Sequence, residues 1–208
     1  MKIIWLFECV ALLAVSSTAS AQFAGHSGIS SEQTYSGREA FDDLAEFGGC
    51  YATRQQKEAL TLLATPPGSA NEARVYKQLF SKSQFCLGDL TSLSVPWTYV
   101  RGAVGEGFYT RKVPVPSNYA APHSLAPDKV QSVMDAAVCY ADKHAAEARA
   151  LIETTKPATK EESAAMEALW PNFETCLPAN MPQGFKFDPL IVRYRIAEAL
   201  WRLGWIHS

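Results

Sequence analysis

The sequence lacks the features that mark most redox enzymes, metalloproteins and membrane proteins. It has no C-x-x-C pair and no closely spaced cysteine and histidine pairs, which excludes the usual redox and zinc motifs. Beyond its first residues, no segment is long and apolar enough to cross a membrane. A formal net charge of −2 gives no basic field for general nucleic-acid binding. We therefore expect no cofactor, no metal and no nucleic-acid partner.

The beginning of the chain carries the clearest functional signal. Met1-Lys2 precedes a short apolar run interrupted by Glu8, and the small residues Ala19-Ser20-Ala21 follow. A positive start, a short apolar run and a small-x-small ending are typical of a secretory signal peptide. The alternative is an ordinary buried N-terminal helix. We predict cleavage after Ala21 and a soluble exported protein, periplasmic or secreted.

Four of the five cysteines remain after this cleavage. They are Cys50, Cys86, Cys139 and Cys176. Four cysteines in an oxidising compartment predict two disulfides, with three possible connectivities. Because the spacings are nearly equal, we predict the bonds Cys50–Cys86 and Cys139–Cys176. Such bonds stabilise small helical units and are not expected to be redox catalysts.

The tripeptide Cys-Tyr-Ala occurs twice, beginning at Cys50 and at Cys139. Further matches follow at an offset of 89 positions, which grows to 90 and then 92 only where proline and glycine mark loops. Loops absorb insertions and helices do not, so this is the pattern of a diverged duplication. The matched pairs include Leu62 with Leu151, Glu72 with Glu162, Cys86 with Cys176, Arg101 with Arg193 and Glu106 with Glu198.

Helical spacing of apolar residues recurs in both copies, and strand patterns are scarce. We therefore predict an all-α fold of two tandem repeated helical modules, each with an internal disulfide. The predicted boundaries are signal peptide 1–21, flexible arm 22–36, module 1 37–111, linker 112–126 and module 2 127–208. The predicted helices include 71–80, 99–109, 127–143, 145–154, 160–169 and 189–204.

The segment "RGAVGEGF" (101–108) is rich in glycine and superficially suggests a phosphate-binding loop. A phosphate loop needs a preceding strand and usually a Lys-Ser/Thr pair, and neither is evident. Gly105 and Gly107 also align with Ala197 and Ala199 of the second copy. We interpret them as small residues at a close contact between helices.

Two arginine–glutamate pairs recur in the copies, Arg101 with Glu106 and Arg193 with Glu198. Five residues on a helix turn through about 500°, so the two members do not share a face. We expect each to meet a partner elsewhere in its own module, as a structural or binding charge, and removal of either glutamate to cost a similar free energy. The alternative is a carboxylate in a cleft between the modules, working in acid–base chemistry.

The last predicted helix carries Tyr194, Trp201 and Trp205 among arginines. Aromatic and basic residues together can seat a helix on a membrane. This helix is apolar on most of its sides, however, which is typical of a buried helix. We predict that these aromatics belong to the core.

The stretch "CYATRQQKEALTLLATPP" (50–67), the later Cys86-Leu87 and the "R-G-A-x-x-E" helix from Arg101 resemble a set of uncharacterised exported bacterial proteins. The resemblance covers most of the mature chain and implies signal peptides and all-helical, duplicated cysteine-bearing modules. It implies no activity.

These observations favour an exported binding or interaction module of the cell envelope, and we expect its partner to be another envelope protein. One alternative is a small-molecule hydrolase with its site between the modules. Another is a structural component of the envelope.

Overall fold

The computed structural model of the chain describes residues 38–81, 85–86, 95–121, 123, 125, 129–178 and 187–205. In this part of the chain the fold is all-helical, with no strand, as predicted. None of its helices is both long and apolar enough to span a membrane. The predicted signal peptide and arm lie outside the described residues. The helices are α1 (Arg38–Arg54), α2 (Gln56–Ala64), α3 (Ala70–Ser81), α4 (Trp97–Thr110), η1 (Ser117–Tyr119), α5 (Val133–Lys143), α6 (Ala145–Thr154), α7 (Lys160–Glu174) and α8 (Pro189–Arg202).

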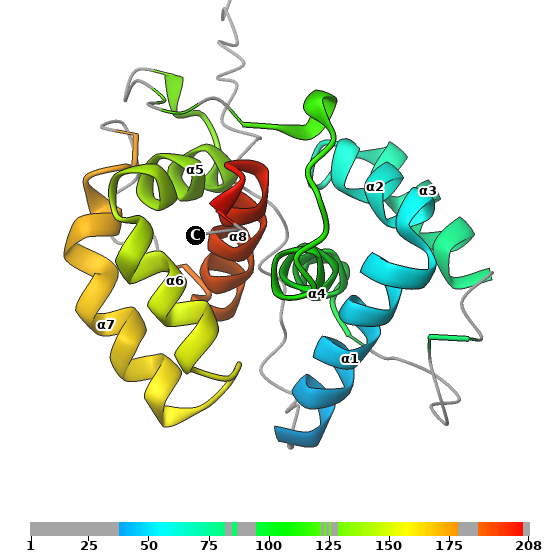
Figure 1. Ribbon diagram of the computed structural model, residues 1–208, viewed down its shortest axis with the longest axis horizontal. Coiled ribbons are helices and arrows are strands. Elements are labelled where there is room, and N and C mark those ends of the chain that lie inside the picture. Colours follow the sequence, from blue (N-terminus) through cyan, green and yellow to red (C-terminus); the bar gives the residue numbers. More distant parts are fainter. Residues whose placement is uncertain are drawn as a thin grey trace, which may run out of the picture.

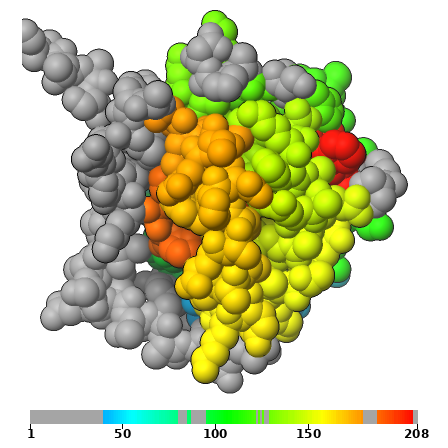
Figure 2. Space-filling model, turned by 90° about the vertical axis from the view of Figure 1, so that its left-hand side faces the viewer, coloured from blue at the N-terminus to red at the C-terminus, as the bar shows by residue number. Residues whose placement is uncertain are grey.

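The helices form two groups, α1–α4 and α5–α8, which we call the N-terminal unit and the C-terminal unit (Figure 1). Helices α4 and α8 pack against each other at the centre. In the N-terminal unit α1 packs on α4, and in the C-terminal unit α5 and α6 pack on α8. Figure 2 shows α5, α6 and α7 covering the outer side of the C-terminal unit.

The two central helices are buried on almost every side. All residues from Tyr99 to Tyr109 in α4 are buried, and so are ten consecutive residues from Val192 to Trp201 in α8. Among the predicted core aromatics, Tyr194 and Trp201 are buried, and Trp205 packs partly buried against the core. The prediction that the last helix is a core helix is therefore confirmed.

Glycines bring α1 and α4 unusually close together. A Cβ atom added to Gly48 would lie 2.0 Å from the backbone oxygen of Ala103, and one on Gly107 would lie 2.4 Å from the oxygen of Gly48. A Cβ on Gly105 would lie 3.0 Å from the Cβ of Glu198. The interpretation of Gly105 and Gly107 as residues of close helix contacts is confirmed.

Both predicted disulfides are present. Cys50 of α1 bonds Cys86 in the turn after α3, and Cys139 of α5 bonds Cys176 in the turn after α7. The bonds close loops of 36 and 37 positions, which removes about 4 kcal/mol of unfolded-state entropy for each bond. Each bond joins the first helix of its unit to the turn that follows the third.

Two predicted helix boundaries are wrong. The helix expected from 127 begins at Val133, because the Ser132 hydroxyl accepts from the Asp135 amide and caps the helix there. The helix expected to end at 169 continues through Pro171 to Glu174. A proline costs a helix one hydrogen bond, and burial of Phe173 in the core offsets this loss.

The chain between α4 and α5 packs against the end of α8. Trp201 donates its indole N–H to the backbone oxygen of Val113, and the amide of Ala121 donates to the oxygen of Arg202. The predicted linker is therefore tied to the C-terminal unit. That the two units arose by duplication stays a prediction.

Candidate functional site: a buried ion-pair network between the two units

Arg101 of α4 lies at the centre of the first half of the network. Its guanidinium is buried and makes two bonds to the Glu198 carboxylate of α8, at 3.1 and 3.4 Å. It also donates to Glu72 at 3.2 Å, within its own unit. Its Nη1 and Nη2 groups also donate to backbone oxygens at the end of α2, those of Leu62, Leu63 and Thr65. Because the last carbonyls of a helix have no partner within the helix, Arg101 also acts as the C-terminal cap of α2.

Arg193 of α8 lies at the centre of the second half of the network, where the arginine comes from the C-terminal unit and the glutamate from the N-terminal unit. It bonds both carboxylate oxygens of Glu106 in α4, at 2.8 and 3.2 Å. It also donates to the hydroxyl of Thr155 at 2.8 Å. Its other contacts are the backbone oxygens at the end of α6, those of Leu151, Ile152 and Thr155. Each arginine thus caps a helix of its own unit and binds a glutamate of the other unit.

This exchange of partners corrects the expectation that each glutamate would be paired inside its own module. The expectation is wrong for Glu106, which binds Arg193 of the other unit. It is incomplete for Glu198, which binds Arg101 and also Arg195 and Arg202 of its own helix. The five-residue spacing explains the geometry, because it turns the arginine toward the unit's own second helix and the glutamate toward the neighbouring central helix.

Glu198 is the most strongly held carboxylate in the network. It is fully buried, and burial by itself disfavours its ionised form. The positive charges of Arg101, Arg202 and Arg195 outweigh this effect and lower its pKa from 4.5 to about 2. Glu198 therefore stays ionised at neutral pH and is unsuited to act as a general acid.

The two units differ in how the glutamate in the first turn of their third helix, Glu72 or Glu162, is bonded. Glu72 accepts a hydrogen bond from Arg101, whereas Glu162 lies 3.6 Å from Arg193 and its Oε1 atom has no hydrogen-bond partner within the described residues. Burial raises the pKa of Glu162, and the positive charge of Arg193 only partly offsets that rise. The C-terminal half of the network is therefore the less completely bonded one.

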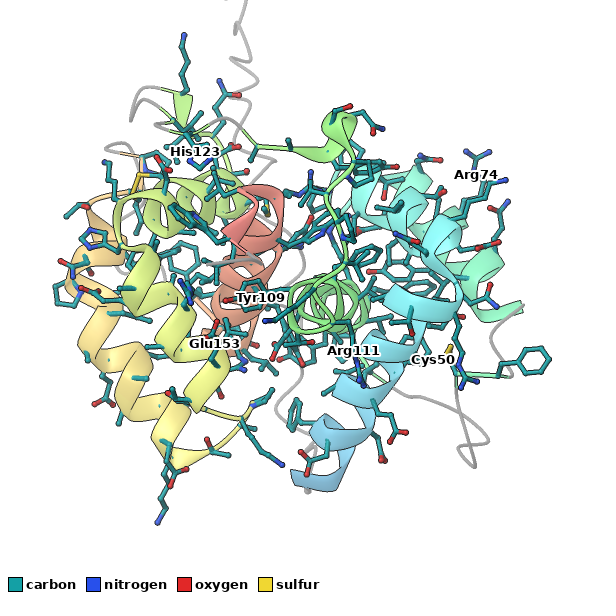
Figure 3. The ribbon with its side chains drawn as sticks, in the orientation of Figure 1. Cys50, Arg74, Tyr109, Arg111, His123 and Glu153 are labelled. Carbon is teal, nitrogen blue, oxygen red and sulfur yellow. A yellow bond between two sulfur atoms is a disulfide. The ribbon has the colours of Figure 1, made fainter. Side chains whose placement is uncertain are left out.

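Tyrosine–carboxylate bonds join the units at the edges of this network. Tyr109 of α4 donates to Glu153 of α6 at 2.5 Å, and Figure 3 shows the two side chains meeting between these helices. Tyr99, also of α4, donates to Asp188 at 2.5 Å. These contacts could not be predicted from the sequence, because no periodicity relates residues that come from separate units.

Arg195 and Arg202 were not predicted as partners of Glu198, although a local signal was present. They stand three residues before and four residues after Glu198, so all three share one face of a helix. Neither position has a cationic counterpart in α4, so the internal sequence matches do not include them.

The network can hold two units in one register, but it offers no open carboxylate for chemistry. Glu106 and Glu198 do lie between the units, as the enzyme alternative supposed, yet both are bonded within a packed helix contact. An open surface hollow of about 470 Å³ lies elsewhere, lined by Ala45, Glu46, Thr110 and Arg111. In the part of the chain that the structure describes, no group of three or more His, Cys, Asp and Glu side chains could hold a metal ion.

Comparisons with family models, with curated proteins and with solved structures gave no match. The resemblance to exported bacterial helical proteins therefore stays a prediction.

Proposed function

We propose that this chain is an exported binding module of the cell envelope. In this proposal it presents to a partner an exposed aromatic side chain whose backbone is held in place by a disulfide. The observation that carries the proposal is Phe85, which is 79% exposed. Its neighbour Cys86 is bonded to Cys50, so the exposed ring is attached to a fixed point of α1. Aromatic side chains are enriched at binding interfaces, and holding one in place reduces the entropy lost on binding.

The proposal includes a scaffold made of two copies of one helical module. Local details at matched positions support it. The α1–α2 break at Gln55 has φ −126° and ψ 40°, and the α5–α6 break at His144 has φ −125° and ψ 42°. Helices α3 and α7 begin in the same way: Ser69 or Thr159 accepts from the amide of Glu72 or Glu162. The same glutamate accepts from the amide of Gly68 or Ala158, the residue before the cap.

Export is the second part of the proposal. Two disulfides and the small-residue ending at Ala19-Ser20-Ala21 support it, because disulfides persist in oxidising compartments. Intact-mass measurement on protein recovered from the envelope tests the cleavage after Ala21. A mass that still includes residues 1–21 contradicts it.

The binding role is tested by placing a photo-crosslinking amino acid at position 85 in the full chain in living cells. The matched control is position 175, since Thr175 precedes Cys176 as Phe85 precedes Cys86 and is also exposed. We expect an adduct to a protein or to a lipid from position 85 and none from position 175. Equal labelling from both positions, or no adduct from either, would overturn the proposal.

A further inference from the structure

Along residues 51–79 of the N-terminal unit every exposed charged side chain is a cation, whereas the earlier part of α1 exposes the acids Asp42 and Glu46. These cations are Arg54, Lys57, Arg74 and Lys77, which we call the cationic face. The acidic residues of this stretch are not exposed: Glu72 is buried in the network and Glu58 is partly buried. Arg74 points away from the protein at the outer edge of the unit (Figure 3).

The C-terminal unit supplies an internal comparison. Lys143 stands at the position matching Arg54, but the other three cations are replaced. Ala146, Ala164 and Glu167 stand where the N-terminal unit has Lys57, Arg74 and Lys77, and all of them are exposed. The outer side of α7 also exposes Glu161 and Glu174. The group of four exposed cations is therefore not repeated at the matched positions of the C-terminal unit.

The two exposed large apolar side chains of the described residues lie beside this face. Phe85 is attached through Cys86 to Cys50, which stands one helical turn before Arg54 on the same side of α1. Trp97 is 46% exposed. Its ring centroid lies 4.5 Å from that of Tyr76, the residue before Lys77. Cations and aromatic rings thus occur together here and not at the matched positions of the C-terminal unit.

We infer that the cationic face docks on a membrane surface rich in anionic phospholipid, with Phe85 inserted at the level of the headgroups. This inference rests on the proposed binding function and names its partner. Clusters of four or more lysines and arginines are attracted to anionic headgroups, and exposed aromatic rings partition into the interfacial layer. Long lysine and arginine side chains keep their charge at the headgroups while their stems lie on apolar surface.

A bilayer suits this face better than a single acidic segment of a protein does. The four cations are carried by the outer sides of helices, at the end of α1 and along α2 and α3. They therefore come from three separate helices. A lipid surface offers delocalised negative charge that cations from several helices can meet together, with an apolar layer for Phe85.

The test is co-flotation of the full mature chain with vesicles of phosphatidylglycerol and phosphatidylcholine, or of phosphatidylcholine alone, at low and at raised salt. We expect binding to the anionic vesicles that weakens as salt rises. Each cation contributes about fivefold, so Arg74→Gln with Lys77→Gln weakens binding about 25-fold. Phe85→Thr, which installs the residue of the matched position, weakens it about tenfold.

The matched control removes the same charge from the other unit. Lys143→Gln with Lys160→Gln changes binding by no more than about twofold if the face alone is responsible. An equal loss in this control, or equal binding to both kinds of vesicle, overturns the inference. Absence of vesicle binding combined with a protein adduct at position 85 overturns the membrane partner and leaves the binding function standing, with an acidic protein as its target.

Discussion

The α1–α4 crossing of the N-terminal unit is made by glycines, whereas alanines stand at the matched positions of α5 and α8. Gly48 and Gly107 bring their backbones into contact, and Ala137 and Ala199 are their buried counterparts. A second difference lies at the contact of the central helices. A Cβ on Gly102 would lie 2.3 Å from the Tyr194 ring. The missing side chain of Gly102 in α4 therefore leaves the space that the Tyr194 ring of α8 fills.

These differences show how two similar halves acquire a single arrangement. In the ion-pair network the exchange is reciprocal, with one arginine and one glutamate given by each helix. The contact of Tyr194 with Gly102 is not reciprocal and exists in only one orientation. Reciprocal ion pairs fix which faces of α4 and α8 meet, and complementary side-chain sizes distinguish one helix from the other.

The largest expected effect separates the two glutamates of the network. Glu198→Gln leaves Arg101, Arg195 and Arg202 without their common counter-charge, and we expect it to lower the free energy of unfolding by about 3 to 5 kcal/mol. Glu106→Gln affects Arg193 alone, which keeps its bonds at the end of α6, so its cost should be smaller. The contacts thus predict unequal costs in place of the similar costs expected from the sequence. Urea unfolding of both variants at pH 7 measures the difference.

The effect of Glu198 should also depend on pH in a defined direction. Because its pKa falls from 4.5 to about 2 on folding, it stabilises the folded state above pH 4.5. That contribution disappears as the pH falls from 4.5 to about 2. The difference between wild type and Glu198→Gln should shrink over this range, and a constant difference would contradict the proposed charge interaction.

The disulfides should be equal in thermodynamic effect and unequal in reactivity. Since the closed loops are nearly the same length, replacing either pair with serines should cost about 4 kcal/mol. Cys50 is only half-buried, whereas Cys139 and Cys176 are each 1% exposed. Under native conditions dithiothreitol should therefore reduce Cys50–Cys86 first, as measured by alkylation and peptide mapping. Equal rates would show that both bonds open only by global unfolding.

The small residues of the first helix in each unit, Gly48 in α1 and Ala137 in α5, can be exchanged to compare how closely the two helices pack. Gly48→Ala places a Cβ atom against backbone that cannot move aside easily, and should cost about 1 to 3 kcal/mol. Ala137→Gly, the reverse change at the matched position, should cost about 1 kcal/mol through lost helix propensity. Thermal unfolding of both variants tests this order. A neutral Gly48→Ala would mean that α1 and α4 are not in such close contact.

The smallest expected effect concerns the loops before α3 and α7. Gly68 has φ +75° and Ala158 has φ +58°, so both adopt the left-handed conformation. A Cβ on Gly68 would meet no atom within 4 Å, and backbone strain alone should make Gly68→Ala cost about 1 kcal/mol. Ala158→Gly should stabilise the protein by up to about 1 kcal/mol for the same reason. Changes of the same sign in the two melting temperatures would contradict this explanation.

Local patterns were sufficient for the elements of the fold. The predicted helix 145–154 coincides with α6, and the predicted helix 71–80 lies within α3. The disulfide pairing followed from spacing, because a pair closes the loop between two helices of one unit. The helix boundaries at Val133 and Glu174 were missed, because they depend on a cap and on burial of Phe173 against the core.

The sequence by itself determined the helices, the disulfides and the direction in which Arg101 and Glu106 point from their helix. Only the tertiary structure decided which carboxylate each arginine meets. Helical spacing fixes the angle between two side chains on one helix, but it carries no information on which other helix lies at that angle. That choice was made by the packing of α4 against α8, where Gly102 admits Tyr194 and brings each glutamate to the arginine of the other unit.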